Sequence, residues 1–316
     1  MGDGRAGYAA GGPGTLGAPE WRRIAVITAG AVALFVAVRE LPTGTNLSHM
    51  DFRVQGGNVI QFCDPGNPQF LPVVSVRSPV TFTIATTRPP MADTDVDATL
   101  TLRTFSGKPI APQDLQIVQT RPIHLLIADS SLGDYQHVHP TPGRTPGDWT
   151  FRFRPRYGGL YRIFADFTPV ATSRGLYASV DLNVGGAPSP VVAGTQPVGW
   201  TVLEAGYRFD LHPAVTPLRA GRPVDLTLVV TRPGGGEVPL EPVMDAFAHL
   251  VAFDGARSGF AHIHPNQADV TKRPDSVRPT FTFKVAIPAA GRYVMWSQVN
   301  LAGREVFAPF WFDVAP

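Results

Sequence analysis

Residues 123–140 read IHLLIADSSLGDYQHVHP, and residues 248–265 read AHLVAFDGARSGFAHIHP. The second stretch repeats the histidines, the aspartate and the closing proline of the first, 125 positions later. Each stretch contains a short apolar run, a turn-rich middle and a second short run that ends in His-x-His-Pro. Two short runs separated by a turn are typical of a β-hairpin. The sequence therefore contains one hairpin motif twice, which indicates a duplicated β-rich unit.

The sequence around each hairpin repeats as well. Phe151-Arg-Phe153 and Gly159-Leu-Tyr161 match Phe281-Thr-Phe283 and Gly291-Arg-Tyr293. The 32 glycines and 32 prolines favour short strands joined by turns. Strands are predicted at residues 80–86, 97–105, 123–128, 135–139, 149–154, 159–167 and 176–184, and again at 207–211, 224–231, 246–253, 260–264, 280–285, 291–299 and 306–314. Seven short strands in about 100 residues are typical of an immunoglobulin-like β-sandwich. We therefore predict an all-β protein with two such domains in tandem.

The length of 316 residues agrees with two domains and an N-terminal extension. A segment rich in glycine and proline separates the two strand series and reads as a linker. The predicted parts are a disordered lead (1–20), a signal anchor or transmembrane helix (21–41), a first sandwich with an extension (46–185), the linker (186–197) and a second sandwich (198–316).

Residues 24–38 are uncharged and apolar or small, with Arg22 and Arg23 before them and Arg39 after them. Fifteen such residues are short for a membrane span and long for the apolar part of a signal peptide. An uncleaved signal anchor, a cleaved signal peptide and a buried helix all remain open, and the anchor is favoured. The arginines before the segment place the N-terminus inside and the domains outside the cytoplasm, periplasmic or extracellular.

The formal net charge of +2 and the scattered basic residues argue against a nucleic-acid partner. The single cysteine, Cys63, excludes an internal disulfide and a multi-cysteine metal site. Cys63 is interpreted as a small buried hydrophobic residue, with a metal ligand or an intermolecular disulfide as alternatives. No phosphate-binding loop, dinucleotide fingerprint or nucleophile elbow is present.

The spacing of the histidines predicts their orientation. His137 and His139 lie two residues apart on one strand and therefore share a face. If Ala128 pairs with Tyr135, His124 lies opposite His139 on that same face. In the second copy, pairing of Phe253 with Phe260 places His249 opposite His264 in the same way. Cross-strand neighbours have Cβ atoms about 5 Å apart, so three imidazoles converge in each copy.

Imidazole is the commonest side-chain ligand for zinc and copper. We therefore predict metal ligands at the six repeated histidines: His124, His137, His139, His249, His262 and His264. The alternative is a hydrogen-bonded structural cluster. Candidates for supporting the ligands are Asp129, Asp254, Asp166 and Gln298, with polar turn or edge residues as the alternative for each. His49 and His212 lie outside the repeat and are interpreted as surface residues.

The pattern of His-Leu-(Leu/Val), ten further residues, His-(Val/Ile)-His-Pro and a later Gly-x-Tyr resembles a largely uncharacterised module of exported bacterial proteins. Residues 121–184 and 246–314 carry this resemblance. Such modules are sometimes associated with heavy-metal or copper handling, so the resemblance implies metal binding by the six histidines but no defined activity. The methionine-rich patterns of periplasmic copper chaperones are absent, which favours Cu(II) or Zn(II) over Cu(I).

Three functions follow from these observations. The favoured one is a membrane-anchored, extracytoplasmic protein that binds a transition metal, copper or zinc, for homeostasis or delivery to a protein partner. The alternative is a structural or interaction protein of tandem immunoglobulin-like domains without metal. The third is a hydrolase or redox enzyme with a three-histidine metal site. It is least favoured because no carboxylate is clearly placed as a general base.

Overall fold

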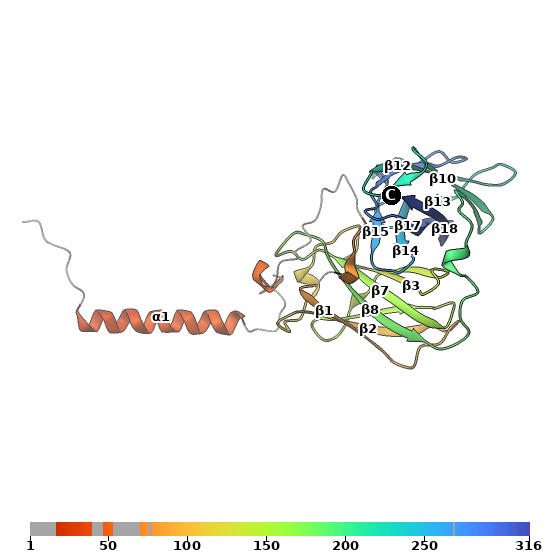
Figure 1. The fold of residues 1–316 in the computed structure, drawn as a ribbon. Helices are drawn as coiled ribbons and strands as arrows, with labels where there is room; N and C mark the ends of the chain where they lie inside the picture. Colours follow the sequence, from red (N-terminus) through yellow and green to blue (C-terminus); the bar gives the residue numbers. More distant parts are fainter. Residues whose placement is uncertain (1–16, 40–46, 53–69, 76–77, 268) are drawn as a thin grey trace, which may run out of the picture.

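The computed structural model describes residues 17–39, 47–52, 70–75, 78–267 and 269–316 (Figure 1). These residues form an N-terminal helix and two β-sandwiches, which confirms the predicted fold class. Most of the predicted lead, residues 1–20, lies outside the described residues, and so does Cys63.

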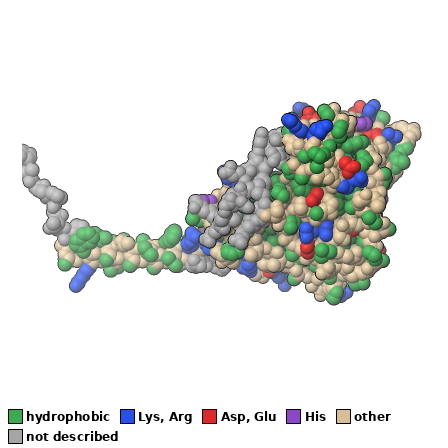
Figure 2. All heavy atoms as spheres, in the orientation of Figure 1, with side chains coloured by type: hydrophobic (Ala, Val, Ile, Leu, Met, Phe, Trp, Pro, Cys, Tyr) green, Lys and Arg blue, Asp and Glu red, His purple; other side chains and the backbone are tan. Residues whose placement is uncertain are grey.

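Helix α1 (Ala18–Arg39) extends away from the sandwiches and buries none of its residues (Figures 1 and 2). Its 22 residues would span about 33 Å, close to the thickness of a membrane's hydrocarbon core. Exposed apolar side chains such as Ile27, Leu34 and Phe35 cover its surface. By length and composition α1 suits a membrane anchor or a signal sequence.

The first sandwich consists of two four-stranded sheets around an apolar core that contains Leu100, Leu125, Trp149 and Ile163. One sheet has the order β1 (Val80–Thr86), β2 (Val96–Thr104), β6 (Asp148–Phe153), β5 (Thr141–Pro142). The other has the order β4 (Tyr135–Val138), β3 (Ile123–Asp129), β7 (Gly159–Phe167), β8 (Leu176–Val184). Short 3-10 turns lie at His49–Phe52, Val73–Ser75, Pro112–Asp114 and Ala193–Thr195.

The second sandwich repeats this arrangement around Phe209, Leu250, Phe283 and Phe310. Its first sheet has the order β16 (Thr280–Val285), β12 (Val224–Thr231), β10 (Tyr207–Pro213), β9 (Thr201–Glu204). Its second has the order β11 (Leu218–Arg219), β18 (Arg304–Ala315), β17 (Gly291–Leu301), β14 (Ala248–Asp254), β15 (Phe260–Ile263), and β13 (Leu240–Glu241) also pairs with β17.

The two sandwiches share the order of seven equivalent strands, as the sequence repeat predicts, whereas β5, β9, β11 and β13 have no counterpart among the described residues. The order β1-β2-β6 corresponds to β10-β12-β16, and β4-β3-β7-β8 corresponds to β15-β14-β17-β18. In both, the His-x-His motif begins in an edge strand, β4 or β15. The internal duplication therefore holds for the topology as well as for the sequence.

Strands β3 and β14 are buried on both faces. All seven residues of β3 are buried, whereas β2 alternates between buried and partly exposed positions. One face of β3 packs in its own sandwich through Leu125 and Ile127. The other packs against the second sandwich in a separate apolar cluster of Leu126, Ala128, Tyr135, Phe164, Val251, Phe253, Phe260, Val294 and Trp296. This interdomain core holds the histidine-bearing sheets face to face.

Residues 70–75, which we call the clasp, precede the first sandwich but contact the second. Leu71 forms a two-way backbone pair with Phe260: its N–H donates to the Phe260 carbonyl at 2.7 Å, and its carbonyl accepts at 3.1 Å. Leu71 and Val73 join the interdomain core, and Phe70 joins the core of the second sandwich. The clasp therefore extends the edge at β15 and connects the two sandwiches.

Candidate metal centre between the two domains

The two histidine hairpins have the predicted registers. Ala128 pairs with Tyr135 between β3 and β4, and Phe253 pairs with Phe260 between β14 and β15. His137 lies opposite Leu126, a residue of the interdomain core. Because side chains alternate along a strand, the histidines lie on the face of each hairpin that meets the other domain.

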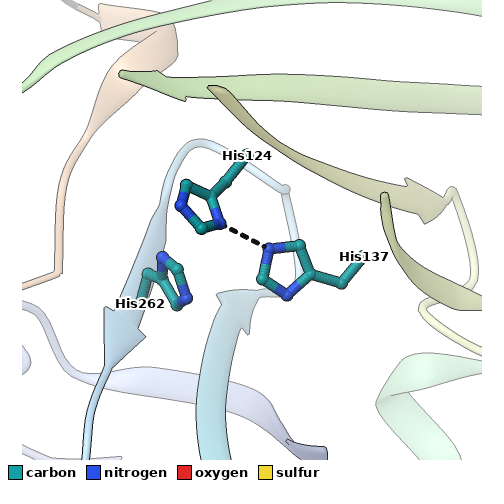
Figure 3. A group of neighbouring side chains, drawn as sticks. All are labelled: His124, His137 and His262. Carbon is teal, nitrogen blue, oxygen red and sulfur yellow. Dashed lines mark hydrogen bonds between the residues drawn. The ribbon is translucent and has the colours of Figure 1, made fainter. Parts of the chain in front are cut away.

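The sequence predicts that three imidazoles converge in each copy, and the structure adds a contact between the two sets. The two sets of three histidines meet across the interdomain core. The ring centroid of His262 lies 5.4 Å from that of His124 and 5.1 Å from that of His137. His124, His137 and His262 each offer one nitrogen within 4.8 Å of the others (Figure 3). A single candidate centre therefore draws on both domains.

Three ring nitrogens of the first copy lie in direct contact. His124 Nδ1 is 3.2 Å from His137 Nε2 and also 3.2 Å from His139 Nε2. Nitrogens that bind one tetrahedral zinc ion at about 2.0–2.1 Å are themselves about 3.3 Å apart. The spacing of these nitrogens therefore suits ligands of one ion, with His139 as a neighbouring fourth candidate.

An oxygen atom orients each of the rings of His124, His137 and His262. His124 Nε2 lies 3.0 Å from the carbonyl of Val118, and His137 Nδ1 lies 2.8 Å from Gln298 Oε1. His262 Nδ1 lies 3.2 Å from Asp166 Oδ2. These oxygens accept hydrogen bonds, so the nitrogen facing each one carries the proton. The opposite nitrogens, His124 Nδ1, His137 Nε2 and His262 Nε2, then carry no proton and present lone pairs.

Asp166 and Gln298, two of the candidates for supporting the ligands, contact histidines of the other domain. Asp166 pairs with His124 between β3 and β7, and Gln298 pairs with His249 between β14 and β17. Their side chains cross the interface to His262 and His137 respectively. A carboxylate or amide behind a histidine is the usual arrangement of metal-ligand imidazoles.

Burial keeps the histidines neutral. Desolvation lowers the pKa of His124 and His262 to about 4, and that of His139 and His264 to about 3. Desolvation is also the largest of the causes that hold the pKa values of His137 and His249 well below the usual value. Neutral imidazoles have the free lone pair that metal ligation requires.

The second copy contains buried nitrogens with no hydrogen-bond partner among the described residues. They are both nitrogens of His249, together with Nε2 of His262 and of His264. His249 is fully buried. Leaving a buried polar atom unpaired costs about 1–3 kcal/mol. A hydrogen-bonded structural cluster accounts poorly for these atoms, whereas an ion held by His124, His137 and His262 would account for Nε2 of His262.

Asp129 and Asp254 serve the hairpin loops instead of the histidines. Asp129 accepts hydrogen bonds from the backbone N–H groups of Ser131 and Asp134. Asp254 accepts from the backbone N–H and the hydroxyl of Ser258. The prediction that these two carboxylates support metal ligands is therefore wrong, because the tight loops use their oxygens locally.

Two groups that contact the candidate centre or its supporting residues could not be identified from the sequence. The Val118 carbonyl is a backbone group, which no residue pattern could indicate. Glu305 accepts a hydrogen bond from Gln298 Nε2 at 2.9 Å. Glu305 stands outside the repeated motif, and only the pairing of β17 with β18 brings it near Gln298.

Solved structures with detectable similarity are distant. The Escherichia coli adhesin FdeC is 15% identical over 74% of this chain, with a TM-score of 0.25. A putative membrane-anchored protein from Corynebacterium diphtheriae is 11% identical over 74%, with a TM-score of 0.24. Fibronectin(III)-like modules of CbhA from Clostridium thermocellum are 9% identical over 74%, with a TM-score of 0.18. The chain spans 64%, 59% and 93% of these three chains.

No curated protein sequence matches the chain. A family model described as a domain of unknown function, DUF8832, matches residues 75–184 and again residues 201–316. These two segments correspond to the two sandwiches and contain all six repeated histidines. The chain therefore belongs to the DUF8832 family and contains its domain twice.

Proposed function

We propose that this is a membrane-anchored, extracytoplasmic protein that binds a transition metal, copper or zinc, between its two domains for homeostasis or delivery. Its α1 helix serves as the anchor. The observation that carries the proposal is that His124 Nδ1, His137 Nε2 and His262 Nε2 carry no proton and present lone pairs. Each ring is held by an oxygen behind its other nitrogen.

The donor set favours a borderline metal ion. Imidazole nitrogen suits zinc and copper, whereas calcium and magnesium prefer oxygen ligands. Among divalent ions, copper binds nitrogen ligands most tightly, so copper is the first choice. Three protein ligands leave a fourth position, either for His139 or for a ligand from a partner that exchanges the ion.

The test is metal binding by the full-length chain, purified in detergent without a polyhistidine tag. Elemental analysis and calorimetry with Cu(II) and Zn(II) should detect tight binding. His124→Gln in the first domain and His262→Gln in the second should each weaken binding of the same ion, because the ion needs both domains. His212→Gln, on the surface at the end of β10, is the matched control and should bind as the natural chain does.

The second candidate function is an interaction protein without metal. The interdomain core favours it, since apolar packing alone could hold the two sandwiches as one surface. Absence of Cu(II) and Zn(II) binding by the natural chain would select this function. Two independent ions, each lost with the histidines of one domain only, would contradict the shared centre while leaving metal binding intact.

A further inference from the structure

A chain of hydrogen bonds leads from the candidate centre toward the surface. His137 Nδ1 lies 2.8 Å from Gln298 Oε1, and Gln298 Nε2 donates to Glu305 Oε2 at 2.9 Å. His137 and Gln298 are buried. Glu305 lines a cavity of about 310 Å³ between the domains, together with Tyr135 and Trp296. The chain of contacts therefore connects a buried imidazole with a carboxylate near solvent.

The pairing of β17 and β18 explains this contact. Glu305 lies opposite Asn300, two positions from Gln298 on the same strand. Residues two apart share a face, so Glu305 is a diagonal neighbour of Gln298 and within reach of its side chain.

Each hydrogen bond in this series fixes the orientation of the next group. A carboxylate accepts hydrogen bonds, so it orients the amide of Gln298 with its NH₂ group toward Glu305. The amide oxygen then faces His137 and can only accept, so His137 carries its proton on Nδ1. Nε2 is left with a free lone pair, 3.2 Å from His124 Nδ1.

We propose that Glu305 is a positioning residue that selects His137 Nε2 as a ligand nitrogen by fixing the orientation of Gln298. The tautomer follows from the hydrogen bonds alone, whereas the role of the nitrogen as a ligand rests on the proposed function. Glu305 does not touch the ion.

The duplicated domain contains an internal comparison that supports this role. Asp166 occupies the position equivalent to Gln298 and places its carboxylate directly behind His262. Asp166 pairs with Tyr177 on β8, as Gln298 pairs with Phe307 on β18. The residue two positions before Tyr177 is Gly175, whereas the residue two positions before Phe307 is Glu305. A carboxylate thus supports both His137 and His262. Asp166 contacts His262 directly, whereas Glu305 acts on His137 through the amide of Gln298.

The experiment measures the tautomer without metal. In full-length protein labelled with ¹⁵N-histidine and freed of metal by a chelator, long-range ¹⁵N–¹H spectra distinguish Nδ1–H from Nε2–H. The His137 signal is assigned from its loss in His137→Gln. The natural chain should show His137 as Nδ1–H. Glu305→Gln should show a mixture, because a glutamine side chain can donate to the Gln298 oxygen as well as accept from its NH₂ group.

Two further variants keep the test specific. Glu204→Gln changes another carboxylate of the same cavity and should leave the tautomer unchanged. The double variant Gln298→Asp with Glu305→Gln copies the arrangement behind His262 and should restore Nδ1–H. An unchanged His137 tautomer in Glu305→Gln would overturn the proposal.

Zinc titration of the same samples separates this proposal from the proposed function. Only the fraction of molecules with Nδ1–H can ligate through Nε2, so Glu305→Gln should bind Zn(II) more weakly in proportion to that fraction, about twofold for an equal mixture of tautomers. Zinc affinity equal to that of the natural chain despite a changed tautomer would overturn the ligand role of Nε2. Absence of zinc and copper binding by the natural chain would overturn the proposed function and leave the effect of Glu305 on the tautomer intact.

Discussion

Replacing His249 with leucine should stabilise the metal-free protein. His249 is fully buried, and neither of its ring nitrogens has a hydrogen-bond partner among the described residues. Its ring lies beside the rings of His262 and His264, with centroids 6.0 and 5.0 Å away. Leucine has a similar size and no polar atoms, so it removes the penalty without leaving a large cavity. The buried, unpaired imidazole of His249 is thus expected to lower the stability of the metal-free fold.

Two unpaired nitrogens at about 1–3 kcal/mol each give a penalty of about 2–6 kcal/mol. Taking the lower value, His249→Leu should raise the melting temperature by about 4–8 °C when the two sandwiches, roughly 230 residues together, unfold as one unit. The assay is thermal and urea unfolding in the presence of a chelator, with His212→Leu as an exposed control that should change stability by no more than about 0.5 kcal/mol. A loss of stability in His249→Leu would refute the reasoning, because it would mean that the ring makes favourable polar contacts in the metal-free fold.

Two further predictions concern pH and the clasp. Burial lowers the pKa of His124 and His262 to about 4, whereas these residues titrate near about 6.5 in the unfolded chain, so metal-free stability should fall as pH drops from about 6.5 to about 4. Equal urea midpoints at about pH 7 and about pH 5 would contradict this. A Cβ at Gly259 would lie 1.7 Å from the Leu71 carbonyl oxygen, so Gly259→Ala should detach the clasp and speed hydrogen exchange at the amides of Leu71 and Phe260. Unchanged protection of both amides would show that the close approach is unnecessary.

The sequence predicted the hairpins, their registers and the shared face of the histidines, because alternation along a strand depends only on local geometry. It did not predict that this face meets the other domain. Apolar residues on both faces of β3, Leu125 and Leu126 among them, indicated burial on both sides but not what covers the second side. The crossed partners Asp166 and Gln298, and the role of Glu305, depend on that docking and on long-range strand pairing. Neither leaves a pattern in a single sequence.

The clasp also decides where a soluble fragment should begin. The family match starts at residue 75, yet Leu71 pairs with the edge at β15 and fills part of the interdomain core. A fragment cut at the family boundary would leave the backbone N–H and C=O groups of Phe260 open to pairing with other chains. Unpaired edges of this kind promote aggregation. Fragments that begin before Phe70 should therefore remain monomeric at concentrations where shorter ones self-associate.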